Sequence, residues 1–272
     1  MSRRADRRAV VSIAALDVRR RPDHRAELGS QLLAGEVVRV IGGSRDRRWR
    51  EVENLADGYR GWVRDWGLLE RPATRIMRWS RAAAARVAAL FVEVRARPGA
   101  GALLTPLFWN ARVILAGARG PHARVELPDG RQGWIPRRAL AAGETRRSLA
   151  DRVAGLLGIP YFWGGRTPLG FDCSGLTQQL LVERGVPLPR DAREQFEASK
   201  ELRDGEQPRP GDLVFFGARG RPVGHVGIGL GGTLYAHCRG VVRLSSMDSR
   251  NPLYDKELAP QFRGWRRPRS SA

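Results

Sequence analysis

The first half of this chain repeats itself. VSIAALDVRRRP at 11–22 matches VAALFVEVRARP at 87–98, and DGYRGWV at 57–63 matches DGRQGWI at 129–135. The two pairs of matching segments are offset by 76 and 72 residues. A period of this size restricts the fold, because one small structural unit must be built twice from the same pattern.

Each copy has the pattern of a small all-β module. An apolar β-type run leads to a Pro turn, then to a strand pattern (EVVRVIG at 36–42, ARVILAG at 111–117), then to a hairpin ending in Gly-Trp. Closely spaced short strands predict two small β-barrels, over 1–72 and 73–142. The pattern resembles the bacterial SH3-like domain, in tandem. The segment IMRWSRAAAARVAAL between the copies is either a short linking helix or an extended lead-in strand.

The second half of the chain has a different pattern. A helical periodicity over 149–157 is followed by an aromatic-glycine loop and a second helical segment. DLVFF (212–216), HVGIGL (225–230) and TLYAHC (233–238) are then β-type runs separated by glycines. Helices followed by an antiparallel sheet predict an α+β domain over 143–272, and thus a multidomain chain.

Cys173 lies at the start of the second helical segment, in FDCSGLTQQLL. Leu176, Leu180 and Leu181 recur at the spacing of an apolar helix face, and Asp172 is placed to cap the helix. Cys173 is therefore expected in the first turn, where unpaired N–H groups and the helix dipole favour a thiolate, the nucleophilic form. The alternative is a small buried cysteine, since free cysteine is among the most buried residue types.

A nucleophilic thiolate needs a base, and the chain has four histidines. His24 and His122 lie in the β modules, whereas His225 and His237 lie on strands of the second half. Because these two are separated by a Gly-Gly turn, adjacent antiparallel strands are expected to bring both imidazoles to one edge. Together with Cys173 they predict the nucleophile, base and orienting group of cysteine peptidases. The structural alternatives are a solvated His225 and a hydrogen-bonded core His237.

Six motifs of this half resemble those of the NlpC/p60 cysteine peptidases, which have a papain-like α+β fold and hydrolyse cell-wall peptides. In the family's order they are YFWGG (161–165), FDCSGL (171–176), PRD (189–191), RPGDLVFF (209–216), GHVGIGL (224–230) and YAHCRG (235–240). The resemblance covers 143–266. It implies that Cys173 is the nucleophile, that His225 is the general base, and that His237 orients it. It also implies that Tyr161 lies near the oxyanion position.

Two SH3-like modules before such a domain make the chain similar to the γ-D-glutamyl-L-diamino acid endopeptidases of murein recycling (dipeptidyl-peptidase VI type). In those relatives the first SH3-like domain walls off one end of the cleft and binds the free amine of L-Ala. The implied substrate is L-Ala-γ-D-Glu-diamino acid, cut after D-Glu, with no metal and no cofactor. The residues implied to bind it are Glu27, Tyr59, Asp172, Ser174 and Asp191.

The resemblance has two departures. Ala192 stands where the family often has serine, which removes one expected hydrogen bond. Cys238 follows His237, where a small hydroxyl residue is common. Because successive side chains on a strand point to opposite faces, Cys238 is expected to face away from Cys173.

The net charge and its distribution along the chain restrict the classes of binding partner that are expected. The net charge of +20 is spread as +5, +9 and +6 over 1–72, 73–142 and 143–272, so no segment is a basic tail. The sequence has no zinc knuckle, basic heptad helix or RNA-stacking signature, and nucleic acid is not expected as a partner. Cys173 and Cys238 are expected to be thiols, because two distant cysteines are too few for a disulfide scaffold.

The N-terminal MSRRADRRAVVSIAAL imitates a signal peptide, but Asp17 and three arginines follow and the apolar run recurs inside the chain. No run reaches the ~18 apolar residues of a membrane span. The expectation is a cytoplasmic peptidase that acts on murein-derived peptides without a membrane partner. Two alternatives stay open: a papain-like amidase or acyltransferase with another acyl substrate, and a non-catalytic wall-binding or nucleic-acid-binding protein.

Overall fold

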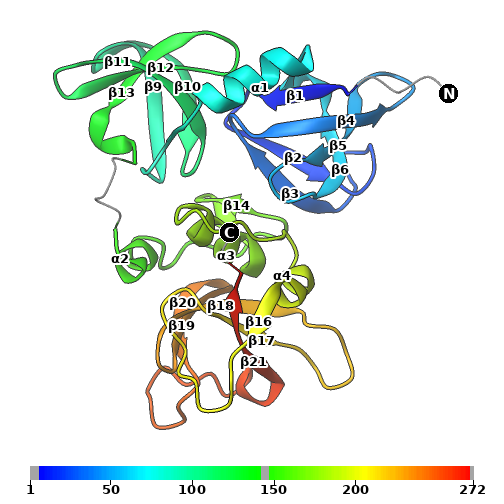
Figure 1. Cartoon of the computed structure of the whole chain (residues 1–272), viewed down its shortest axis with the longest axis vertical. Coiled ribbons are helices and arrows are strands. Elements are labelled where there is room, and N and C mark those ends of the chain that lie inside the picture. The colour runs from blue at the N-terminus through cyan, green and yellow to red at the C-terminus, as the bar shows by residue number, and fades with distance from the viewer. Residues whose placement is uncertain (1–5, 142–146, 270–272) are drawn as a thin grey trace. The chain divides into compact units, whose positions relative to one another are not determined.

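The computed structural model describes residues 6–141 and 147–269. They form two compact units, Met1–Arg146 and Arg147–Ala272, each of which is described by itself (Figure 1). Unit 1 is built almost entirely of strands, whereas unit 2 has helices followed by an antiparallel sheet, which confirms the expected fold class. The expected boundary between residues 142 and 143 lies outside the described residues, and the domain limits stay predictions. None of the helices in the described part has the length and apolar character that a membrane crossing requires.

The first sheet of unit 1 comes from the first copy of the repeat. Its antiparallel strands lie in the order β3-β2-β6-β5-β4-β1-β7. The strands are β1 (Arg8–Val11), β2 (Ala15–Arg19), β3 (Leu28–Leu33), β4 (Val37–Gly43), β5 (Trp49–Asn54), β6 (Arg60–Arg64) and β7 (Leu68–Arg71), with a 3-10 turn at Asp65–Gly67. Val11, Val38 and Val63 are completely buried in its core. Each such side chain stabilises the fold by roughly 1.5–3 kcal/mol, so the apolar run near the N-terminus serves as core strands.

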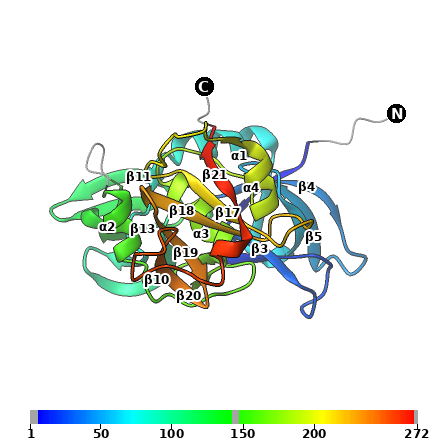
Figure 2. The same ribbon diagram turned by 90° about the horizontal axis from the view of Figure 1, so that it is seen from below.

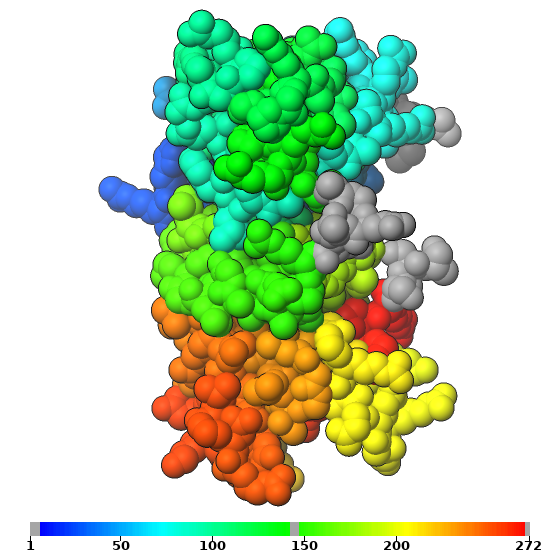
Figure 3. Space-filling model, turned by 90° about the vertical axis from the view of Figure 1, so that its left-hand side faces the viewer, coloured from blue at the N-terminus to red at the C-terminus, as the bar shows by residue number. Residues whose placement is uncertain are grey.

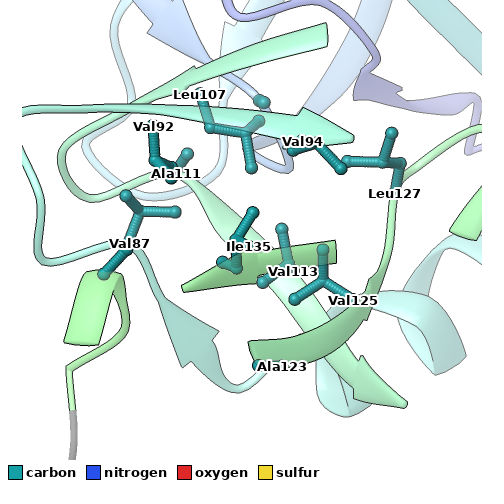
Figure 4. Close-up of a cluster of buried hydrophobic side chains, with 12 residues drawn as sticks. Val87, Val92, Val94, Leu107, Ala111, Val113, Ala123, Val125, Leu127 and Ile135 are labelled. Atoms are coloured by element: carbon teal, nitrogen blue, oxygen red, sulfur yellow. The ribbon is translucent and has the colours of Figure 1, made fainter. Parts of the chain in front are cut away.

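The second copy forms a sheet with the order β10-β9-β13-β12-β11-β8. Its strands are β8 (Ala85–Arg86), β9 (Phe91–Arg97), β10 (Ala100–Phe108), β11 (Arg112–Arg119), β12 (His122–Glu126) and β13 (Gln132–Pro136), followed by a 3-10 turn at Arg137–Ala139. Figure 4 shows its core, in which Val94, Val113, Val125 and Ile135 lie together. All four side chains are completely buried.

The segment between the two sheets combines both structures that the sequence left open. A helix, α1 (Ala73–Ala82), is followed by the short strand β8. Ile76 of α1 packs against Val10 and Val37 of the first sheet. The Arg112 backbone N–H donates to the Ala34 carbonyl at 2.9 Å, which ties the second sheet to the first.

The repeated Gly-Trp has a structural reason in both copies. A Cβ on Gly61 would lie 2.5 Å from Val18 Cγ1 and 2.9 Å from the Arg19 carbonyl oxygen. A Cβ on Gly133 would lie 2.4 Å from Val94 Cγ1. Since only glycine permits this approach of β6 to β2 and of β13 to β9, the motif encodes the same strand contact twice.

Unit 2 carries a six-stranded antiparallel sheet with the order β16-β21-β17-β18-β19-β20. Its elements are α2 (Leu149–Ala154), β14 (Arg166–Thr167), β15 (Gly170–Phe171), α3 (Cys173–Val182), α4 (Ala192–Ala198), β16 (Ser199–Glu201), β17 (Leu213–Phe216), β18 (His225–Gly231), β19 (Leu234–Arg239), β20 (Val241–Ser246), a 3-10 turn at Ala259–Gln261, and β21 (Phe262–Pro268). Helix α3 packs on β18 and β19 (Figure 2). The chain from β18 to β20 forms part of the orange surface in Figure 3.

Candidate active site

Cys173 is the first residue of α3, as the sequence predicted. Asp172 caps the helix, and its Oδ1 accepts the Gly175 N–H at 2.6 Å. Leu176 and Leu180 are fully buried and hold the helix in the core of unit 2. The Cys173 side chain is thereby fixed at the helix N-terminus with only 7% of its surface exposed.

The Asp172 carboxylate is the centre of a buried network. Besides the cap, it accepts the Gly164 N–H at 3.0 Å and two bonds from Arg190, at 3.1 and 2.6 Å. Ser174 Oγ accepts another Arg190 bond at 2.9 Å and lies 3.3 Å from Asp172 Oδ1. A bidentate Arg–carboxylate pair fixes geometry as well as charge. The network therefore locks the glycine loop to the start of α3.

Asp172 and Ser174 were expected to bind substrate. Both are buried in this structure and hydrogen-bonded to protein partners at the start of α3. Their role toward the substrate stays a prediction. Sequence reasoning missed Arg190 as their partner, and its place in the PRD motif was the available signal.

The two imidazoles expected to meet do so. His225 begins β18 and His237 lies on the adjacent antiparallel β19. His225 Nε2 lies 2.8 Å from His237 Nδ1, within hydrogen-bond distance. This contact engages Nε2 of His225, and the pairing of its Nδ1 with the Cys173 sulfur stays a prediction.

Beyond His237 lies a set of residues that the sequence analysis did not identify. His237 Nε2 is 3.0 Å from Ser245 Oγ and accepts a 3.3 Å bond from Arg243 Nε. Arg243 also donates to Asp255 at 2.6 Å. When Nε2 of His237 carries its proton, it donates to Ser245, and Nδ1 then accepts the Nε2–H of His225. That tautomer excludes the bond from Arg243 Nε, which needs an unprotonated Nε2, so the Ser245 and Arg243 contacts belong to alternative protonation states of His237.

The Cys173 sulfur lies beside the end of β18 that carries His225. The backbone N–H groups of Val226, the residue after His225, and of Ser174 donate hydrogen bonds that favour its thiolate. Burial opposes them and raises the pKa of Cys173 to about 12, with a further contribution from Asp172. The expectation of a thiolate favoured by the helix N-terminus is therefore wrong for this structure, because the loss of water around the sulfur outweighs the dipole.

Burial also acts on the histidines. Burial, with the charge of Arg239 as the next cause, lowers the pKa of His225 to about 4. It lowers the pKa of His237 to about 3, with His225 as the next cause. At neutral pH the nucleophile is consequently a thiol and its base a neutral imidazole. Proton transfer between them creates an attracting pair of charges, so ionisation is coupled to attack.

Tyr161 and Cys238 line a cavity of about 560 Å³ together with His225. The Tyr161 N–H donates to the Gly240 carbonyl at 2.7 Å, and burial and the Cys173 and Asp172 charges raise the pKa of Tyr161. Tyr161 is thus under the electrostatic influence of Cys173, and its place near the oxyanion stays a prediction.

Cys238 does not face away from the nucleophile region, contrary to expectation. Its thiol donates to the Phe171 carbonyl at 3.1 Å, two residues before Cys173. After burial, the charge of a Cys173 thiolate is the largest influence that raises the pKa of Cys238. Alternation along β19 holds, since His237 reaches instead to His225. Both cysteines are free thiols.

The remaining predicted residues lie at the start of α4 and in unit 1. Asp191 is the N-cap of α4 without a side-chain cap bond, and Ala192 begins that helix. Glu27 and Tyr59 belong to unit 1. Glu27 is exposed, whereas Tyr59 packs against the first core, with Arg20 over its ring at 5.4 Å. Their role toward the substrate stays a prediction. The described residues contain no group of three or more His, Cys, Asp or Glu side chains placed to hold a metal ion.

Comparison with known proteins gives two family matches. Residues 158–260 match the NlpC/P60 family, and residues 18–68 match the bacterial dipeptidyl-peptidase SH3 domain. The chain is 39% identical to dipeptidyl-peptidase 6 of Lysinibacillus sphaericus over 119 residues, which cover 42% of this chain and 41% of that protein. It is 49% identical over 77 residues to the bifunctional muramidase/DL-endopeptidase CwlT of Bacillus subtilis (strain 168), covering 27% and 23%. The chain thus spans less than half the length of these curated relatives.

Two solved structures show the same fold. An NlpC/P60 family protein from Bacillus cereus ATCC 10987 superposes with a TM-score of 0.80 at 20% identity, covering 96% of this chain and 99% of that one. An NlpC/P60 endopeptidase from Photobacterium damselae subsp. piscicida superposes with a TM-score of 0.66 at 17% identity, covering 88% and 66%.

Proposed function

We propose that this chain, which carries an NlpC/P60 domain and a bacterial dipeptidyl-peptidase SH3 domain, is a cysteine peptidase of murein peptides. It cuts the bond between γ-D-Glu and the diamino acid in peptides with a free N-terminal L-Ala. The observation that carries the proposal is the array of a helix-start thiol beside β18 and two imidazoles joined at 2.8 Å. The relative named dipeptidyl-peptidase 6 supports the dipeptide-releasing specificity.

In the first half-reaction the Cys173 sulfur attacks the γ-carbonyl carbon of D-Glu as its proton passes to Nδ1 of His225. The Cys173 backbone N–H at the helix N-terminus, with the Tyr161 hydroxyl, stabilises the oxyanion of the tetrahedral intermediate. His225 then gives its proton to the departing amine of the diamino acid. The C–N bond breaks and a thioester remains on Cys173.

In the second half-reaction water attacks the thioester. His225 takes a proton from the water, the C–S bond breaks, and the proton returns to the sulfur. The products are the dipeptide L-Ala-γ-D-Glu and the free diamino acid. His237 keeps His225 in one ring orientation through both halves, and this role requires the tautomer in which His237 Nε2 donates to Ser245.

The proposal is tested by incubating the protein with L-Ala-γ-D-Glu-diaminopimelate and detecting the products by mass spectrometry. We expect release of the dipeptide, its loss in Cys173→Ala, and slow cleavage of the N-acetylated peptide. Transfer of the acyl group to an added amine without hydrolysis would support an acyltransferase instead. No turnover of any murein peptide would overturn the peptidase.

The free-amine requirement is assigned to Glu27 and Tyr59, as the resemblance implied. We expect Glu27→Gln to weaken binding of the free-amine peptide and to leave the N-acetylated peptide unchanged. The proposed role is cytoplasmic recycling of murein peptides. Fractionation of cells that produce the protein tests this, because recovery outside the cytoplasmic fraction would contradict it.

A further inference from the structure

The cavity beside His225 has a one-sided charge. Its lining includes Tyr161, His225 and Cys238, together with the arginines Arg221 and Arg239. Among the described residues that line it there is no aspartate or glutamate. A cavity of this volume, with two cations and no lining carboxylate, suits a small anionic group.

The position of the cavity identifies the part of the substrate that enters it. His225 lines the cavity, whereas Cys173, buried at the start of α3, does not. His225 must stand next to the nitrogen that it protonates, and this nitrogen belongs to the leaving diamino acid. The leaving group therefore extends into the side of the cleft where the two arginines lie.

Both arginines bring positive charge to the lining of the cavity. Within the described part of the chain, Arg221 is exposed and makes no ion pair. Arg239 pairs with Glu257 and, at 3.7 Å, with Asp255. Because the Glu257 side chain is 73% exposed, its pairing with Arg239 is weak and exchangeable. Arg239 thus already holds two carboxylates beside the cavity, the exposed Glu257 and the buried Asp255, of which Glu257 is the one that a substrate carboxylate can replace.

Resting on the proposed function, we propose that Arg221 and Arg239 bind the carboxylates of the leaving diamino acid and select diaminopimelate over lysine. Both amino acids carry the α-carboxylate, but they differ at the end of the side chain. The side chain of diaminopimelate ends in an amine and a carboxylate, and the arginines attract the carboxylate. Lysine ends in a lone ammonium, which meets two like charges and no lining carboxylate.

Electrostatics at His225 support this assignment. After burial, the charge of Arg239 is the largest influence that lowers the pKa of His225. A substrate carboxylate bound to Arg239 offsets that charge and favours the imidazolium. The correct leaving group thereby helps to charge the acid that expels it.

The experiment compares kcat/KM for L-Ala-γ-D-Glu-diaminopimelate and L-Ala-γ-D-Glu-lysine. Wild type, Arg221→Gln, Arg239→Gln and Arg219→Gln are assayed. Arg219 lies in the same loop as Arg221 but does not line the cavity, so it is the matched control for loss of one charge. We expect the wild type and Arg219→Gln to prefer diaminopimelate by about tenfold, and each cavity variant to lose most of that preference.

Binding of the two peptides to Cys173→Ala is measured in parallel by calorimetry. If the protein binds the diaminopimelate peptide more tightly than the lysine peptide, this preference depends on Arg221 and Arg239, and the wild type cleaves neither, then this inference stands and the peptidase proposal is overturned. Cleavage of both peptides at equal rates would keep the peptidase and overturn this inference. Equal effects of all three arginine variants, or no binding of either peptide, would also overturn it.

Discussion

Replacement of Arg190 by methionine removes the cation that holds the start of α3. The Arg190 side chain is 1% exposed, and among its hydrogen bonds are two to Asp172 and one to Ser174. Methionine fills much of the same volume but donates nothing. Asp172 is then left as a buried carboxylate with only backbone N–H groups and Ser174 around it.

The expected loss of stability is large. Removing one partner of a buried ion pair costs about 3–5 kcal/mol, because the other charge is left without compensation. For a unit of this size that corresponds to a fall of about 10–20 °C in Tm. The Gly164 loop and Cys173 also lose their common anchor, so kcat is expected to fall more than KM rises.

Scanning calorimetry of the full chain, followed by peptide kinetics, measures both effects. Arg193→Met is the matched control, because Arg193 lies in α4 and makes an exposed pair with Glu197. It is expected to leave Tm and kcat unchanged. The double variant Asp172→Asn with Arg190→Met is expected to recover part of the stability, since it removes the orphaned charge. If Arg190→Met and Arg193→Met behaved alike, the network would not anchor the site and the reasoning would fail.

Four further perturbations follow from the structure. Gly61→Ala and Gly133→Ala place a Cβ within 2.5 and 2.4 Å of a valine methyl, and each is expected to lower the free energy of unfolding by about 1–3 kcal/mol. Gly155→Ala is the control, because its Cβ would lie 3.6 Å from the nearest atom and the change is expected to be tolerated. Chemical denaturation measures the difference. Ser245→Ala removes the hydroxyl that lies 3.0 Å from His237 Nε2 and is expected to lower kcat with little change in KM, whereas Ser245→Thr keeps a hydroxyl there and is expected to retain kcat. Equal kinetics of the two variants would show that the hydroxyl does not orient His237. Because burial lowers the pKa of His225 to about 4 and that of His237 to about 3, the unfolded chain binds protons more readily than the folded one below pH 6.5. Stability is therefore expected to fall as the pH drops from 6.5 toward 4, and the acid limb of kcat/KM to lie nearer 4 than 6.5; a limb at 6.5 would show that His225 is not held neutral by burial. Cys238→Ser keeps a donor for the Phe171 carbonyl and is expected to retain activity, whereas a loss as large as that of Cys173→Ala would give Cys238 a chemical role.

Local patterns predicted those parts of the molecule that local patterns determine. The Gly-Trp repeats marked the strand contact in both sheets, because the missing Cβ at Gly61 and Gly133 is a property of one residue. The capped start of α3 followed from Asp172 and the leucine spacing. The meeting of His225 and His237 followed from a short hairpin, whose register is restricted by the residues between the two strands.

The contacts that the sequence analysis missed join residues far apart in the chain. Arg190 contacts Asp172, 18 residues away in the sequence, and Arg243 contacts Asp255, 12 residues away. Neither spacing is periodic, so neither leaves a pattern to read. The prediction that Cys238 faces away from Cys173 was wrong for another reason. Alternation along a strand gives opposite faces, but only the tertiary fold decides which face α3 covers.

Burial explains why a helix-start cysteine need not be a thiolate. At an exposed helix end the dipole meets little resistance, but Cys173 has been removed from water almost completely. A thiol held neutral in this way is protected from oxidants, which react with thiolates. Attack then requires proton transfer to His225, where the charge of Arg239, the largest influence after burial, opposes an imidazolium while the charge of Asp255 favours it. A substrate that brings carboxylates into the adjacent cavity reduces this opposition at the moment of reaction. Reactivity is then restricted to the bound complex, which is the behaviour that a peptidase specific for one anionic peptide requires.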